Sequence, residues 1–141
     1  MTIENTVEGI FVTALSAISY ISTNSIPVLN WRDADQEAVF PCVVVKADPI
    51  VAEYCKRMPL VICNLMITAA TYTADDKDMT AINALADALQ DYVLNFTESS
   101  LNSNGLLFKG SLYEMGQIEV MENVQVYTIH LENHIEITST T

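Results

Sequence analysis

The chain has 141 residues, of which half are hydrophobic, and its 18 acidic and six basic side chains give a formal net charge of −12. This length is typical of one domain around one core, so we expect a single domain over residues 1–141. The acidic balance argues against a protein that grips nucleic-acid phosphates, because such binding depends on clustered Lys and Arg.

The first predicted element is an amphipathic helix over residues 2–21. Its apolar residues recur at helical spacing: Val7, Ile10, Phe11, Ala14, Leu15, Ile18 and Ile21. Thr2 is available as a cap, and Glu4 and Glu8 lie near the positive end of the helix dipole. The polar run at residues 22–25 ends this helix, and residues 26–29 predict a short extended piece.

Two strands are predicted next, with a loop before them and a connector between them. The loop at residues 30–37 holds Trp31 and Arg32, interpreted as an aromatic edge over the core beside a solvated charge cluster. A β-branched run after Pro41 predicts a strand over residues 40–47. Residues 48–59 predict a connector of mixed charge, and residues 60–72 predict a long strand antiparallel to the first. One face of that strand is wholly apolar: Val61, Cys63, Leu65, Ile67 and Ala69.

A second amphipathic helix is predicted at residues 73–97. Its apolar stripe consists of Ile82, Leu85, Leu89, Tyr92, Val93 and Phe96. Thr73 and Asp76 resemble a capping box, and Asp75, Asp76 and Asp78 are placed to meet the unpaired N–H groups of the first turn. Turn-forming residues at 99–105 end the helix.

A second pair of strands is predicted at residues 106–113 and 123–137, around a turn-like region near Gly116 and Glu122. The last strand alternates between a buried row and a wetter row. The order helix, strands, helix, strands predicts an α+β fold. We expect a mostly antiparallel sheet with two main helices packed on one face, which is a two-layer sandwich.

The wetter row of the last strand is the sharpest chemical candidate: His130, Glu132, His134 and Glu136. Consecutive members lie ~6.6 Å apart, so two neighbours could share a metal but all four could not, and a site would need a further ligand from elsewhere. The same alternation is also typical of a solvent-facing strand. A small metal-binding protein or enzyme that uses His130 and His134 therefore stays open as an alternative.

Other chemistry has no local signal in the chain. It contains no G-x-S-x-G elbow and no phosphate-binding glycine loop. Cys42, Cys55 and Cys63 are predicted to be free buried thiols. No apolar run approaches the ~20 residues that span a bilayer, and the N-terminal stretch lacks the basic region of a secretory signal. We expect a cytoplasmic protein that is not an enzyme, with no catalytic residue, cofactor or metal.

The order of four features resembles the small neck proteins of long-tailed bacteriophages, in particular the tail terminators of the lambda type. These features are the helix at residues 7–21, the strand after a proline at 40–45, the acidic-capped helix at 75–96, and the closing strands at 106–110 and 126–137. The resemblance covers most of the chain. It implies an α+β subunit of a ring, expected to be a hexamer, that caps the finished tail tube and presents a surface to the head connector. It also implies assembly in the host cytoplasm and a final place in the virion.

The partners implied by this resemblance are other copies of the chain, the tail tube protein and the head–tail connector protein. An acidic channel wall is expected to let DNA pass without specific binding. The alternative is a head-completion protein on the capsid side. Since loops between paired strands project from a domain, contacts are expected at residues 48–59 and 110–122. The predicted interface residues are Glu53, Tyr54, Lys56, Arg57, Tyr113, Glu114 and Glu119.

Overall fold

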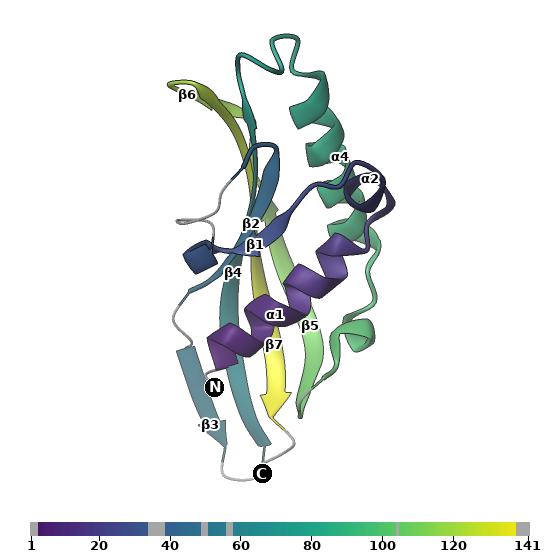
Figure 1. Ribbon diagram of the computed structural model, residues 1–141. Helices are drawn as coiled ribbons and strands as arrows, with labels where there is room; N and C mark the ends of the chain where they lie inside the picture. Colours follow the sequence, from purple (N-terminus) through teal and green to yellow (C-terminus); the bar gives the residue numbers. More distant parts are fainter. Residues whose placement is uncertain (1–2, 34–38, 49–50, 56–57, 104, 138–141) are drawn as a thin grey trace.

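The computed structural model describes residues 3–33, 39–48, 51–55, 58–103 and 105–137, with side chains outside residues 51–60 (Figure 1). The fold is α+β, as predicted, and its described strands form one mixed sheet of seven. The main path of the sheet is β1 (Val28–Asn30), β2 (Cys42–Ala47), β4 (Met58–Tyr72), β7 (Val124–Ile137) and β5 (Leu106–Met115). In addition, β3 (Val51–Cys55) pairs with β4, and β6 (Glu119–Met121) pairs with β7. Among the described strands, only the β1–β2 pair is parallel.

The long strands β4 and β7 form the centre of the sheet and pair continuously from Leu60 opposite Glu136 to Tyr72 opposite Val124. Their side chains alternate between the two faces, as the sequence predicted. The apolar row of β4 is buried, with Cys63 and Ile67 fully inaccessible, and so are Ile129 and Ile135 in β7. The inner face of this central pair therefore forms the floor of the core.

The helices cover that inner face. They are α1 (Ile3–Ser16), α2 (Ser19–Thr23), α4 (Thr80–Asn95) and the 3-10 helix η1 (Glu98–Leu101). Figure 1 shows α1 and α4 on the same side of the sheet, with α1 crossing β1 and β2 and α4 lying over β4 and β7. The ring of Phe11 in α1 contacts those of Phe96 and Phe108, with centroids 6.5 and 6.2 Å apart. Each helix in the described part of the chain is too short or too polar to span a lipid bilayer.

The N-terminal helix is shorter than predicted. It ends at Ser16, and Ile18 adopts an extended conformation before α2 begins at Ser19. The last amides of the turn bond to carbonyls three residues back, as from Ile18 N to Leu15 O at 3.1 Å, which tightens the chain and ends the helix. This change of direction carries Ile21 into the core, where it is 1% exposed. The predicted cap Thr2 lies outside the described residues.

The central helix is also shorter than predicted, because residues 73–79 form turns before α4. Thr73 makes no capping box, and its buried Oγ1 has no hydrogen-bond partner among the described residues. Instead, the carboxylate of Asp76 accepts the first-turn amides of Ala81 and Ile82, each at 2.9 Å. The buried stripe of the helix is confirmed at Ile82, Leu85, Leu89 and Val93, and Tyr92 and Phe96 are half-buried against the core.

Two predicted connections are strands in the structure. The described part of residues 48–59 contains β3, which forms a hairpin with β4 from Cys55 opposite Met58. The region 110–122 contains the second half of β5 and the short strand β6, which turns into β7 at Glu122, where φ is 53°. Charged residues did not prevent either strand, because an edge strand keeps one side and much of its surface in water.

Candidate interaction surface

One edge of the sheet is formed by β5 and β6, which pair with β7 and with no other described strand. We define residues 111–121 as the β5–β6 edge. The tight turn at Glu122 folds β6 back along β7, so β5 and β6 follow one another along the same side of that strand. The edge therefore runs past the end of β5 into β6.

The first half of β5 is covered, and the second half is open. The amide of Phe108 donates to Asn102 Oδ1 at 2.8 Å, and Ser103 and Leu106 exchange backbone bonds of 3.2 and 2.9 Å. Further along, Gly116 N donates to Thr128 O at 3.0 Å. Because backbone groups in a strand alternate in direction, those of residues 112, 114 and 116 therefore point toward β7. By this alternation, the backbone groups of residues 111, 113 and 115 point away from β7, where the described chain has no strand.

Large apolar side chains are concentrated on this edge. Four of them are at least half exposed: Leu112 at 64%, Tyr113 at 50%, Val120 at 59% and Met121 at 58%. Glu114 and Glu119 are exposed beside them. An edge that combines unpaired backbone groups with exposed apolar side chains is a ready template for another chain.

The outer face of the sheet carries the predicted chemical row next to this edge. His130 lies opposite Glu114 on β5 and Met66 on β4, and it lines two shallow hollows of about 350 and 330 Å³. His134 Nε2 contacts Glu132 Oε2 at 2.9 Å, with both side chains about two-fifths exposed. Among the described residues, no group of three or more His, Cys, Asp and Glu side chains could hold a metal ion. Exposed pairs of this kind contribute little to stability.

The opposite side of the sheet has a buried carboxylate at its edge. Glu8 of α1 is 2% exposed, and its Oε2 accepts the amide of Ala47 at 2.8 Å, where β1 has already ended. Arg32 approaches the other oxygen at 3.5 Å and also donates to Asn5. Trp31, which is 38% exposed, lies 5.2 Å from the Lys46 ammonium. A helix side chain thus closes the edge of β2 beyond β1.

The predicted interface residues fall on two edges and are not in one cluster. Tyr113, Glu114 and Glu119 lie together on the β5–β6 edge. Glu53 and Tyr54 belong to β3, at the other side of the sheet. Lys56 and Arg57 lie outside the described residues.

Sequence reasoning missed three apolar members of this edge: Leu112, Val120 and Met121. The sequence did indicate one exposed apolar residue here. Leu112 and Tyr113 are adjacent, and successive side chains of a strand point to opposite faces, so one of the two must face solvent.

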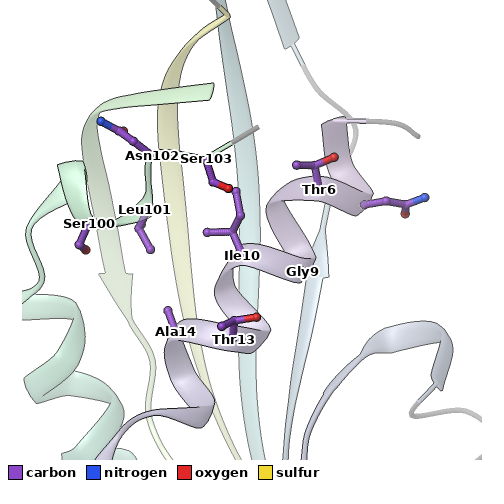
Figure 2. A pocket seen from close by; sticks show the side chains of 10 residues that line it. Thr6, Gly9, Ile10, Thr13, Ala14, Ser100, Leu101, Asn102 and Ser103 are labelled. Atoms are coloured by element: carbon purple, nitrogen blue, oxygen red, sulfur yellow. The ribbon is translucent and has the colours of Figure 1, made fainter. Parts of the chain in front are cut away.

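A separate groove lies between α1 and the segment at η1 (Figure 2). It measures about 570 Å³ and is lined by Asn5, Thr6, Gly9, Ile10, Thr13, Ala14, Ser100, Leu101, Asn102 and Ser103. Figure 2 shows Ile10 and Ala14 on the side of α1 toward Leu101. The described residues of the lining offer hydroxyl and amide groups.

Two cysteines are free and buried, as predicted for Cys42 and Cys63. Burial raises the pKa of Cys63 to about 12, and the nearby charges of Glu4, Glu8 and Asp48 add to this effect. Burial also raises the pKa of Cys42. Both thiols are therefore protonated and weak nucleophiles at neutral pH.

Comparison of the chain with models of known protein families gives no match, and comparison with curated proteins gives no significant similarity.

Proposed function

We propose that this chain is a structural subunit of a ring that caps the tail tube of a long-tailed bacteriophage and joins it to the head connector. The observation that carries the proposal is the β5–β6 edge, where four large apolar side chains lie beside backbone groups that pair with no described strand. Pairing with another chain would satisfy these backbone groups and remove the apolar side chains from water, so such an edge favours association.

A ring requires a heterologous contact, in which two different surfaces of one subunit meet on neighbouring copies. The described sheet offers two such surfaces, at β3 and at the β5–β6 edge. In this proposal the subunit is a two-layer sandwich, with a mostly antiparallel sheet and two main helices on one face. The two edges of the sheet, at β3 and at β5–β6, then form the contacts between copies, and six copies close the ring.

The charge of the chain supports the same proposal. A net charge of −12 is compatible with a channel through which DNA passes without specific binding, because like charges repel. Glu114 and Glu119 contribute exposed carboxylates beside the apolar edge. The protein assembles in the host cytoplasm and ends in the neck of the virion, with the tail tube protein and the connector protein as partners.

The experiment is a capping assay with purified tail tubes. The wild-type protein should bind one end of the tube and stop its further growth. A Val120→Ser, Met121→Ser double variant should lose this activity. A Leu94→Ser variant should retain it, because Leu94 is comparably exposed, at 57%, but lies on α4.

The β5–β6 edge would serve a head-completion protein equally well, which is the second candidate. Incubation with connector-bearing capsids separates the two, since binding to capsids and not to tubes would favour the capsid side. A monomer that carries stoichiometric metal, lost in a His134→Ala variant, would instead favour the small metal-binding protein and contradict both.

A further inference from the structure

The two free edges at β3 and β5 run in opposite directions within the sheet. The three steps from β3 to β4, from β4 to β7 and from β7 to β5 are all antiparallel. Three reversals leave β5 antiparallel to β3. A neighbouring copy in the same orientation therefore brings its β3 alongside β5 with the polarity of an antiparallel pair.

The backbone groups at both edges are available for such a pair. Asp48 N donates to Asn64 O at 2.7 Å, so the backbone groups of the even-numbered residues of β4 point toward the side where β2 and β3 lie. Through the register of β3 with β4, the N–H and C=O groups of Ala52 and Tyr54 then point away from β4. On β5, the groups of residues 111, 113 and 115 point away from β7. Each edge thus presents alternating donors and acceptors over five residues.

The strand β1 is a poorer match than β3. It has three residues, and the next edge amide beside it, at Ala47, is already bonded to Glu8. The first half of β5 is likewise closed by Asn102 and Ser103. Of the strand edges at the two sides of the described sheet, β3 and residues 111–115 offer five residues each, whereas β1 and β6 have three residues each.

We propose that copies of this chain associate head to tail, with β3 of one copy hydrogen-bonded antiparallel to residues 111–115 of the next. The sheet then continues from subunit to subunit. This inference rests on the proposed ring and names the surface that builds it. In such a pair the outward-facing residues of the two strands lie opposite one another, for example Ala52 opposite Tyr113 and Tyr54 opposite Ser111.

Proline substitutions test the backbone contact directly, because proline removes one N–H group and is tolerated at the free edge of a sheet. Tyr113→Pro removes an outward N–H on β5, and Ala52→Pro removes one on β3. The matched controls Tyr113→Phe and Ala52→Ser keep these N–H groups, and Tyr113→Phe also keeps the apolar ring on the β5–β6 edge. Native mass spectrometry over a range of concentrations should show closed rings for the wild type and both controls, and monomers for each proline variant.

Mixing the two proline variants distinguishes head-to-tail pairing from a symmetric dimer. Each variant retains one intact edge, so an equimolar mixture should form a one-to-one dimer and stop there. A mixture that stays monomeric would overturn the inference, as would rings formed by either proline variant. A wild-type protein that pairs symmetrically through β5, and is insensitive to Ala52→Pro, would overturn it as well.

Hydrogen exchange supplies a readout that does not depend on whether a β5 variant folds. The amide of Tyr113 should exchange slowly in wild-type rings and fast in the Ala52→Pro protein, whose β5 is unchanged. Equal exchange rates of the Tyr113 amide in the wild type and in the Ala52→Pro protein would contradict the strand pair. A wild-type protein that stays monomeric at every concentration would contradict it as well. Tail-tube capping by a protein that fails these tests would leave the proposed function intact, whereas rings that pass them but ignore tail tubes would contradict only that function.

Discussion

Replacement of Glu8 by alanine should destabilise the protein by about 1–3 kcal/mol, because it leaves the Ala47 amide buried without an acceptor. The bond is 2.8 Å long and Glu8 is 2% exposed, so water cannot easily take its place. The ion pair with Arg32 adds little, since the Arg32 side chain is 50% exposed and lies 3.5 Å away.

Three further variants separate these contributions. Glu8→Gln keeps a carbonyl oxygen for the Ala47 amide and should cost less than Glu8→Ala. Arg32→Ala should change the free energy of unfolding by about 0–1 kcal/mol. Glu4→Ala, on the same helix but only half-buried, is the control for an acidic residue lost from α1.

Urea unfolding followed by circular dichroism measures all four variants. For a chain of this length, each kcal/mol should lower the melting temperature by about 3–4 °C in a parallel thermal scan. The reasoning is refuted if Glu8→Ala unfolds within about 0.5 kcal/mol of the wild type, the range of an ordinary surface substitution. It is also refuted if Arg32→Ala costs as much as Glu8→Ala.

Three other predictions follow from the described contacts. Asp76→Ala should cost about 1–2 kcal/mol in urea unfolding because it removes the acceptor of two first-turn amides of α4, and the exposed neighbour Asp75→Ala should cost less than about 0.5 kcal/mol. The pKa of Cys63 rises on folding from 9.0 to about 12, so the folded state holds this proton more tightly and stability should fall as the pH rises from 9 to 12. A Cys63→Ala variant should show a smaller fall, and an equal fall would contradict the assignment. The Val120→Ser, Met121→Ser double variant should unfold within about 0.5 kcal/mol of the wild type although it loses tail-tube capping, because both side chains are more than half exposed.

The parts of the fold that follow a clear period were predictable from sequence. In β4 and β7, every second residue must face the core, so the apolar rows that include Leu65 and Ile129 indicated both the strands and their buried face. The stripe of α4 was predictable for the same reason, with a period of 3.6 residues.

The breaks in the helices were harder to predict because the apolar spacing continues across them. Ile18 and Ile21 extend the stripe of α1, although the chain turns at residue 17 and α2 presents Ile21 to the core from a new direction. At α4, Asp76 accepts first-turn amides as predicted, but it does so from four residues before the first helical residue, so the helix begins later than the capping pattern indicated.

The secondary structure of the candidate surface was predicted only in part. Residues 110–122 were expected to project as a loop, whereas backbone pairing with β7 makes most of them strand. The hairpin of β3 was missed because formation of a five-residue strand depends on its partner strand more than on its own sequence pattern. The burial of Glu8 could have been predicted, because Glu8 lies on the same helical stripe as Phe11 and Leu15 and must therefore face the core.

Electron microscopy of the purified protein mixed with tail tubes tests the central proposal most directly. We predict a ring of this protein at one end of each tube, and bare tube ends with the Val120→Ser, Met121→Ser variant. Tubes that stay bare with the wild-type protein, at concentrations where it is folded, would contradict the proposed function.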